Sequence, residues 1–419
     1  MLFRIGKSLF TLAIRQFFAS IKVSGAAPLE TGALIVLPNH ANHFLDPLLV
    51  CGSYTRPFWF IAKGSLFSNA IVSGILRAAH LVPIFRKEDD PQKMANNQES
   101  FEIASRVLRE AKGLVLFPEG KSIGQRKLEP LKTGAARIAF QAEQSSDWQL
   151  GLAIQPVGIT YSDFDEFRSS VTIHLGKPFH IQSYKDRVNA DSVQAVRDLT
   201  EEIEGHLKAL TVQISESSHI ELIEKISKLY QLNGSQLDDK ERISIVTQNV
   251  EKLAPLYPEK AREIEDRLDE LLAMLATIGV GASSPGWHMQ GKLPLPVTLP
   301  VVFVGLVTHL VPYKLVSPIV RKLSKDPVAL GGLKVTTGLL LFLSWYLLLY
   351  ILLLSNFSFI WSMLWLAFIV YSGHFVNRNF DAIKLSVISR LWPGENSPLQ
   401  VLNIMREELI QELETLRIS

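Results

Sequence analysis

The hydrophobic and polar positions divide the chain into regions of different character. Between Ala33 and about Leu175, short apolar runs alternate with stretches of helical periodicity, which predicts strands and helices in turn. The strand candidates are Ala33–Leu37, Phe58–Ile61, Leu81–Phe85, Leu114–Phe117, Leu152–Ile159 and Val171–Leu175. Alternation of this kind predicts an α/β domain with a mixed, largely parallel sheet flanked by helices. We place this domain at residues 24–190.

Beyond the predicted domain the pattern becomes helical. Runs rich in Glu, Lys, Leu and Ile follow one another, for instance Asp191–Leu210, Ser218–Leu232 and Ala261–Leu275. Their apolar positions recur on one face with charges elsewhere, which predicts a solvated helical arm over residues 191–280. A stretch rich in Pro, Gly and Ser follows, and we interpret residues 281–296 as a linker.

The next region, residues 297–376, is apolar enough to enter a membrane. Residues 297–313 are short and interrupted by Pro300, so we expect a re-entrant or interfacial segment. Residues 335–354 and 357–375 carry no charge, and each is long enough to cross a hydrocarbon core of about 30 Å. Only Ser355 and Asn356 separate them, which predicts a transmembrane hairpin.

Basic residues flank the predicted hairpin. Lys325 and Lys334 precede it, and Arg378 and Lys384 follow it. The excess of Lys and Arg on cytoplasmic loops then places both ends of the hairpin on the cytoplasmic side. We accordingly expect residues 377–419 to form a cytosolic C-terminal helix.

Residues 1–23 predict an amphipathic helix. Basic side chains such as Arg4, Lys7 and Arg15 recur at helical spacing opposite Phe10 and Phe17. A basic amphipathic helix is typical of a membrane surface, and a helix packed on the domain is the alternative. Charges interrupt the apolar stretch, which disfavours a signal peptide.

Composition narrows the classes of function. The 419 residues include 43 Lys and Arg against 41 Asp and Glu, and a net charge of +2 argues against nucleic-acid binding. The chain is 47% hydrophobic, and its mean hydropathy of +0.17 is high for a soluble protein. One cysteine, Cys51, excludes an internal disulfide framework and a multi-cysteine zinc site.

Four stretches could carry chemistry, and in three of them polar residues end or follow a predicted strand. His40 and Asp46 come after the first, Arg86 ends the third, and Glu119-Gly120-Lys121-Ser122 follows the fourth. The fourth stretch is the strand that contains Pro156. Parallel strands bring their carboxyl ends to one edge of a sheet, where α/β folds place their sites. We therefore expect these residues to converge.

The types of residue in this set indicate a reaction. His40 could act as a general base, with Asp46 fixing its tautomer. Arg86 and Lys121 supply positive charge suited to a phosphate, and Gly120 lets the backbone approach a ligand. No Ser or Cys lies in a nucleophile-elbow context, which favours direct transfer over a covalent intermediate. Phosphate, hydroxyl and membrane together suggest O-acylation of a glycerol phosphate.

Each element also has a plainer interpretation. A His–Asp pair is often a loop hydrogen bond, and Arg86 could form a surface ion pair. Phe117-Pro118-Glu119-Gly120 could be a turn with glycine at positive φ. His40 and His43 lack an obvious third ligand, so we expect no metal site. The order of the four stretches and their placement at strand ends favour the functional interpretation.

The four stretches resemble the four motifs of the glycerolipid acyltransferase family, which includes glycerol-3-phosphate and lysophosphatidate acyltransferases. The resemblance covers roughly Ile21 to Gly176. It implies that His40 activates the acceptor hydroxyl and that Asp46 orients His40. The substrate-binding residues that it implies are Arg86, Glu119, Gly120, Lys121 and Ser122.

The spacing of the first motif indicates a branch of the family. Five residues separate His40 from Asp46, one more than usual, as in the fungal-type glycerol-3-phosphate or dihydroxyacetone-phosphate acyltransferases. The resemblance implies acyl-CoA or an acyl-carrier protein as acyl donor, glycerol phosphate or lysophosphatidate as acceptor, and no resident cofactor. We expect an integral membrane protein of the bacterial inner membrane or endoplasmic reticulum, with its site on the cytoplasmic side.

Two alternatives remain open from the residues alone. A second kind of enzyme would acylate lysophosphatidate or another lysophospholipid, because the motifs do not separate these acceptors. A protein of another class would be a non-catalytic membrane scaffold, supported by the amphipathic N-terminus, the arm and the hairpin. The intact His40, Asp46 and Glu119 argue against the scaffold.

Overall fold

The computed structural model describes residues 2–85, 97–215, 217–278, 295–392 and 397–418. The chain divides into two compact units. We call Met1–Thr11, Lys22–Thr160 and Thr172–Gln213 the sheet unit. Leu12–Ile21, Tyr161–Val171 and Ile214–Ser419 form the helical unit.

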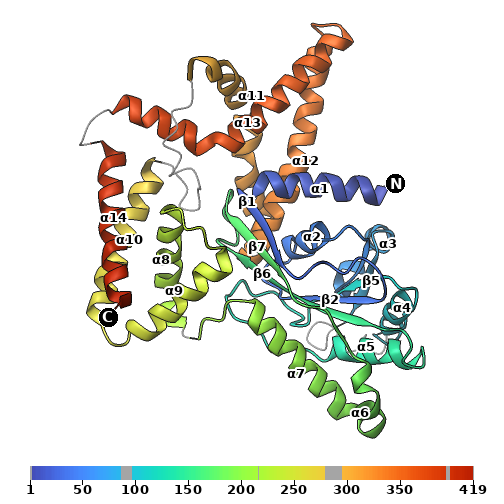
Figure 1. The fold of residues 1–419 in the computed structure, drawn as a ribbon. Helices are drawn as coiled ribbons and strands as arrows, with labels where there is room; N and C mark the ends of the chain where they lie inside the picture. Colours follow the sequence, from blue (N-terminus) through green and yellow to red (C-terminus); the bar gives the residue numbers. More distant parts are fainter. Residues whose placement is uncertain (1, 86–96, 216, 279–294, 393–396, 419) are drawn as a thin grey trace. The chain divides into compact units, whose positions relative to one another are not determined.

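An eight-stranded sheet organises the first part of the chain (Figure 1). Its strands run in the order β1-β7-β6-β2-β5-β3-β4, and β8 pairs antiparallel with β6. β2 lies parallel to β5 and β6, and β3 lies parallel to β4 and β5. The predicted fold class, a mixed and largely parallel sheet with flanking helices, is therefore confirmed. The strands are β1 (Ser20–Gly25), β2 (Leu34–Pro38), β3 (Phe58–Lys63), β4 (Leu81–Ile84), β5 (Gly113–Val115), β6 (Ala153–Tyr161), β7 (Ser170–Leu175) and β8 (Phe179–His180).

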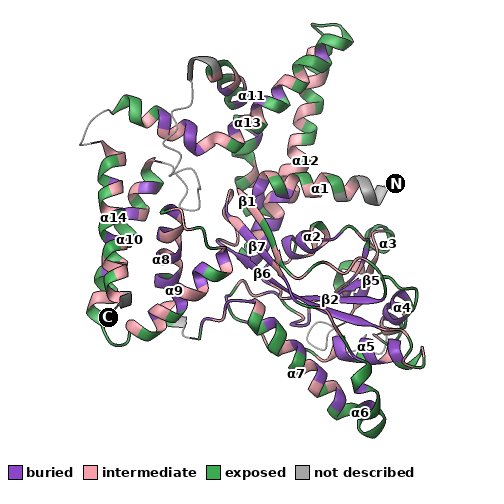
Figure 2. Cartoon of the chain, viewed as in Figure 1, coloured by how far each residue is buried: buried purple, intermediate pink, exposed green. Residues whose placement is uncertain are grey.

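The core of the sheet unit lies between its central strands and the helices that cover them. Every residue of β2 is buried, as its continuous apolar sequence requires of a strand covered on both faces (Figure 2). The helices of this unit are α2 (Leu45–Gly52), α3 (Ala70–Ala78), α4 (Asn97–Arg109), α5 (Gly134–Gln144), α6 (Lys185–Ala190) and α7 (Ser192–Leu210), with the 3-10 turns η1 (Gly64–Phe67) and η3 (Gln182–Tyr184).

Two boundaries differ from the sequence-based expectation. Helix α1 (Leu2–Phe17) ends before residue 23, because the β-branched Ile21 and Val23 continue as strand β1. Helix α7 was assigned to the arm on its charged surface, but it belongs to the sheet unit. Its buried Leu199, Ile203 and Leu207 join the core beneath the sheet.

The sequence left two interpretations of α1, a helix on the membrane surface or a helix packed on protein. In the structure its second half packs against other parts of the helical unit. Ile14 and Phe17 are buried, and the Phe17 ring meets the Phe167 ring edge-on at 5.7 Å. The Asn377 side chain donates to the Gln16 carbonyl at 2.9 Å. The last turns of α1 are therefore held by protein, as the packed alternative expects.

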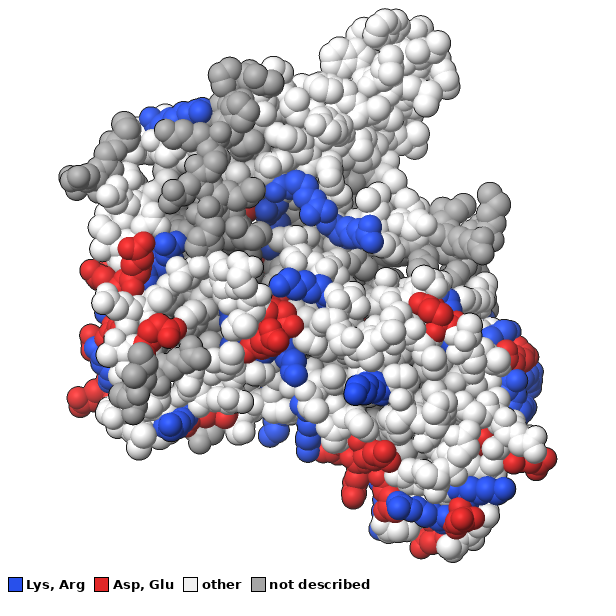
Figure 3. All heavy atoms as spheres, viewed as in Figure 1, with Lys and Arg blue, Asp and Glu red and all other residues white. Residues whose placement is uncertain are grey.

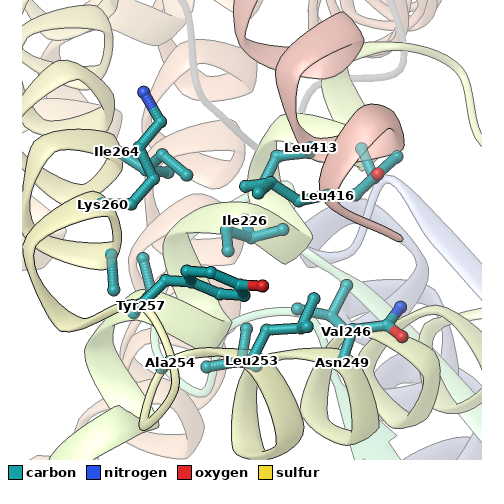
Figure 4. Close-up of a pocket in the computed structure, with 14 residues that line it drawn as sticks. Ile226, Val246, Asn249, Leu253, Ala254, Tyr257, Lys260, Ile264, Leu413 and Leu416 are labelled. Carbon is teal, nitrogen blue, oxygen red and sulfur yellow. The ribbon is translucent and has the colours of Figure 1, made fainter. Parts of the chain in front are cut away.

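The predicted arm appears as helices α8 (Ile220–Leu232), α9 (Asp239–Leu253) and α10 (Pro258–Ile278), joined by α14 (Pro398–Ile418). Helices α10 and α14 are linked by charge: Arg267 donates to the Glu412 carboxylate at 2.6 Å, and Lys260 pairs with the same carboxylate. The Tyr230 hydroxyl of α8 also donates to Glu414 at 2.7 Å. These four helices line an apolar groove that includes Ile226, Leu253, Tyr257, Ile264 and Leu413 (Figure 4).

Among the described residues, three helices of the helical unit are long and apolar enough to cross a membrane: α11 (Leu295–Leu323), α12 (Pro327–Leu354) and α13 (Phe359–Leu391). The outer part of the α12–α13 hairpin carries no Lys, Arg, Asp or Glu (Figure 3). Helix α11 contains Pro300, Pro312 and Pro318 and continues to Leu323. It therefore extends beyond the segment 297–313 expected from the sequence. Whether that segment is re-entrant or interfacial stays a prediction.

The loop between β6 and β7 belongs to the helical unit because ion pairs fasten it there. Lys228 of α8 binds Asp163 at 3.0 Å, and Lys334 of α12 binds Asp165 at 3.1 Å. Arg168 binds Asp381 of α13 at 2.9 Å, and both of these side chains are largely buried.

Candidate functional site

The candidate site begins where β2 ends. Asn39 follows the strand and fixes its end to β6 through two side-chain hydrogen bonds. Its amide donates to the Ile159 carbonyl at 3.1 Å, and its Oδ1 accepts from the Ile159 N–H at 2.7 Å. The residue after Asn39 is His40, so its backbone starts from a fixed point. Sequence reasoning missed this role of Asn39.

His40 and Asp46 are hydrogen-bonded, as predicted. His40 Nδ1 lies 2.9 Å from Asp46 Oδ2, and the Asp46 side chain is fully buried in the first turn of α2. A carboxylate only accepts, so this bond requires the hydrogen on Nδ1, and in the neutral imidazole Nε2 then keeps its lone pair. The His40 side chain is 12% exposed, which leaves a reacting group a way in.

The extra residue between His40 and Asp46 is accommodated by a turn around Asn42. Asn42 Oδ1 accepts from the N–H groups of Phe44 and Leu45, both at 3.2 Å, and so satisfies donors at the start of α2. The Asn42 N–H donates to Asp46 Oδ2 at 2.8 Å. This oxygen therefore receives two donors, and the longer spacing still gives a direct His–Asp bond.

A ring stacked on His40 completes its support. The Phe117 and His40 rings lie 22° from parallel with centroids 4.0 Å apart. Phe117 follows β5, the parallel neighbour of β2, so the sheet register brings the two residues together. In the sequence, Phe117 is the first residue of the Phe117-Pro118-Glu119-Gly120 motif, and no pattern identifies it as a partner of His40.

Glu119 acts on the backbone of His40. Its Oε1 accepts from the His40 N–H at 2.6 Å, and its Oε2 accepts from the Glu129 N–H at 3.0 Å. The side chain is 3% exposed, and this burial raises the pKa of the carboxyl to about 7 although both hydrogen bonds lower it. The structure thus gives Glu119 a positioning role that the sequence did not indicate.

The residues after Glu119 form a loop that is held by a backbone hydrogen bond at Gly120 and an ion pair at Lys121. Gly120 has φ +72°, a conformation that a side chain would strain, and its N–H donates to the Phe117 carbonyl at 3.1 Å. Lys121 Nζ pairs with the Glu129 carboxylate at 2.6 Å, with more than half of the lysine side chain exposed. Ser122 Oγ is buried and, in the described part of the chain, has no hydrogen-bond partner.

The structure thus brings together His40, Asp46 and Glu119, with Gly120 to Ser122 following directly. Arg86 lies outside the described residues. The residue before it, Phe85, is held at the end of β4 by two hydrogen bonds with the Asn97 side chain, at 2.8 and 2.6 Å. Within the described ranges, no group of three or more His, Cys, Asp or Glu side chains could hold a metal ion.

Residues 20–160 match the profile of the acyltransferase family. An uncharacterized acyltransferase of Schizosaccharomyces pombe is 30% identical over 122 residues, which cover 28% of this chain and 18% of that protein. Glycerol-3-phosphate O-acyltransferase 1 of Saccharomyces cerevisiae is 29% identical over 121 residues, which cover 27% of this chain and 15% of that protein.

A bacterial relative matches over a similar length. The probable 1-acyl-sn-glycerol-3-phosphate acyltransferase of Mycoplasma pneumoniae is 30% identical over 115 residues, which cover 26% of this chain and 41% of that protein. The chain thus spans less than half the length of each of these three relatives. Among solved structures, the 1-acyl-sn-glycerophosphate acyltransferase of Thermotoga maritima matches with a TM-score of 0.33 at 18% identity, covering 48% of this chain and 79% of that one.

Proposed function

We propose that the protein acylates a hydroxyl of a glycerol phosphate, from the match of residues 20–160 to the acyltransferase family and from their resemblance to the glycerolipid acyltransferases. The observation that supports this most directly is the bond between His40 and Asp46 at the end of β2. It provides a histidine of defined tautomer whose Nε2 can accept a proton.

The proposed reaction is a direct transfer. His40 Nε2 takes the proton from the acceptor hydroxyl while the oxygen attacks the carbonyl carbon of an acyl thioester. Collapse of the tetrahedral intermediate breaks the C–S bond, and the departing thiolate receives the proton from the imidazolium. Asp46 stabilises that imidazolium through Nδ1–H. The products are an acylated glycerol phosphate and a free thiol.

The acceptor phosphate requires positive charge beside the histidine. We assign Arg86 and Lys121 to this role, with the Ser122 hydroxyl as a hydrogen-bonding group close by, whereas the Gly120 N–H already donates to the Phe117 carbonyl. The donor would be acyl-CoA or an acyl-carrier protein, and the reaction needs no resident cofactor. Glu119 contributes by holding the His40 backbone.

Glycerol 3-phosphate is the acceptor that we propose. The yeast relatives named glycerol-3-phosphate O-acyltransferases support it, as does the five-residue spacing of the first motif. Lysophosphatidate is the second candidate, supported by the name of the Mycoplasma relative. Both products are phospholipid precursors.

We further propose that the protein is integral to a phospholipid membrane with its site on the cytoplasmic side. Three helices are long and apolar enough to span. Basic residues gather at one end of the α12–α13 hairpin, where Lys334 begins and Arg378 ends its uncharged stretch.

The experiment uses the full chain, purified into nanodiscs, with labelled acyl-CoA. The acceptors are glycerol 3-phosphate, dihydroxyacetone phosphate, lysophosphatidate and lysophosphatidylcholine. Transfer to glycerol 3-phosphate, reduced about 10²–10⁴-fold by His40→Ala, is the expected result. Preference for lysophosphatidate selects the second candidate. Equal rates for wild type and His40→Ala, or no transfer to any acceptor, would refute the enzyme and favour the scaffold.

A further inference from the structure

Helix α3 and the turn η1 before it present an uncovered apolar surface. None of the nine residues of α3 is buried (Figure 2). Ile71 is 76% exposed, Ile75 63% and Val72 43%, and Leu66 of η1 is 48% exposed. Positions 71 and 72 lie four and three residues before position 75, so both neighbour Ile75 on one face of the helix. We call Leu66, Ile71, Val72 and Ile75 the α3 patch.

This helix gains little from the rest of the sheet unit. Isolated helices of fewer than about 12 residues are marginal in water. Gly74, in the middle of α3, adds a further cost of about 1 kcal/mol, and a side chain there would meet nothing within 4 Å. The N-terminus of α3 is capped by Asn69, whose Oδ1 accepts from the N–H groups of Ile71 and Val72. A helix of this kind benefits from an apolar medium on its open face.

The α3 patch belongs to the edge of the sheet that carries His40. η1 begins directly after β3, and β3 is separated from β2 only by β5. All three strands are parallel, so their carboxyl ends lie at the same edge. Two strand spacings correspond to about 10 Å. The apolar surface therefore starts beside the candidate site.

The charged residues next to the α3 patch along the sequence are basic. Residues 47–87 contain no Asp or Glu. Lys63 lies directly before η1, and Arg77 lies in the last turn of α3. An apolar face flanked by Lys63 and Arg77 is complementary to the interface of a bilayer that contains anionic lipid.

We infer that η1 and α3 insert the α3 patch into the interface of an anionic phospholipid bilayer, beside the site. The inference extends the proposed function, since it gives the acyl chain a short path between bilayer and His40. The same chain carries helices suited to span a membrane, so a bilayer is within reach of this unit. The other occupant to be excluded is protein, either another part of the chain or a second copy.

The single cysteine makes a depth measurement direct. In a Cys51→Ser background, Ile71→Cys and Ile75→Cys each receive an environment-sensitive fluorophore. Val193→Cys on α7 is the matched control, because this aliphatic side chain is 62% exposed. The labelled full chain is placed in nanodiscs of phosphatidylcholine with phosphatidylglycerol. Nitroxide-labelled lipids probe the bilayer, and iodide probes water.

Quenching at positions 71 and 75 by the lipid nitroxide, with protection from iodide, is the expected result, and the reverse is expected at 193. Iodide quenching at 71 and 75 would overturn the insertion, and protection from both quenchers would overturn it in favour of a protein cover. Replacing phosphatidylglycerol by phosphatidylcholine should weaken lipid quenching. An unchanged signal would overturn the requirement for anionic lipid.

The unmodified chain provides a test that needs no substitution. A carbene photolabel dissolved in the bilayer should modify the peptide that contains residues 64–79 and leave the α7 peptide unmodified. Equal labelling of both peptides would contradict the insertion. Both readouts are independent of catalysis. An inserted α3 in a chain that transfers no acyl group would therefore refute the proposed function while the insertion stands.

Discussion

Both the stability of the sheet unit and the activity of the site should depend on the Glu119 carboxyl. The Glu119→Gln variant tests this. Burial raises the pKa of this carboxyl to about 7, from 4.5 for an exposed glutamate. The folded protein therefore binds the proton more tightly than the unfolded chain. The contribution of Glu119 to stability is fully present below about pH 4.5 and declines as pH rises to about 7. Glutamine has no proton to lose, so this decline should disappear.

The size of the effect follows from the shift. Between pH 5 and pH 8 the wild-type sheet unit should lose about 2–3 kcal/mol that the Glu119→Gln variant retains. Glutamine nevertheless offers one oxygen where two N–H groups, those of His40 and Glu129, now find acceptors. One donor is left unpaired, and the His40 loop loosens. Above pH 7 the variant should therefore be more stable and less active.

Amide hydrogen exchange of β2 measures this stability without interference from the apolar helices α11, α12 and α13, because β2 is entirely buried in the sheet unit. The ratio of variant to wild-type protection should rise about 30- to 150-fold from pH 5 to pH 8. A constant ratio would refute the reasoning. Glu143→Gln is the matched control: this fully buried carboxylate accepts from the N–H groups of Leu150 and Leu152, and the variant should keep its turnover.

The remaining predictions concern the same site. Asp46→Asn should lower kcat about 10²–10⁴-fold in the acyl-transfer assay with membrane insertion intact, because the amide no longer fixes the His40 tautomer. Asn39→Ala, which removes both bonds to Ile159, should lower kcat more than it changes the acceptor KM; an effect on KM alone would contradict a positioning role. Gly120→Ala should destabilise the loop by about 1–2 kcal/mol, seen as a lower Tm, because φ is +72° there. Arg86→Ala should raise the acceptor KM, and an unchanged KM would move the phosphate site elsewhere.

The sheet was largely predictable because its strands are short apolar runs bounded by polar turns. β2 is the clearest case, since a central parallel strand is buried on both faces and reads as continuous hydrophobic sequence. β1 was missed because its polar and apolar residues alternate, which a helical period can imitate over a few positions. Helix α7 was assigned to the arm because its solvent face is charged, whereas its buried leucines reveal the core only once the sheet is in place.

The residues of the site also divide into those that local sequence identifies and those that only the strand order brings together. His40 and Asp46 could be identified because they are close in sequence and of a type suited to proton transfer. Phe117, Asn39 and the bond from Glu119 depend on the order of the strands, which decides that β5 and β6 flank β2. Contacts of that kind join residues about 80 to 120 positions apart, and no local pattern carries them.

The ion pairs between α10 and α14 constrain how the chain can be threaded through a bilayer. α10 ends before α11 begins, and α14 starts after α13 ends. Charged groups that touch, as Arg267 and Glu412 do, must lie on the same side of the membrane. The chain between them therefore crosses an even number of times, although three helices are long enough to cross. If the α12–α13 hairpin crosses twice, as the sequence predicts, α11 must return to the side from which it entered, which agrees with the re-entrant or interfacial segment predicted for residues 297–313.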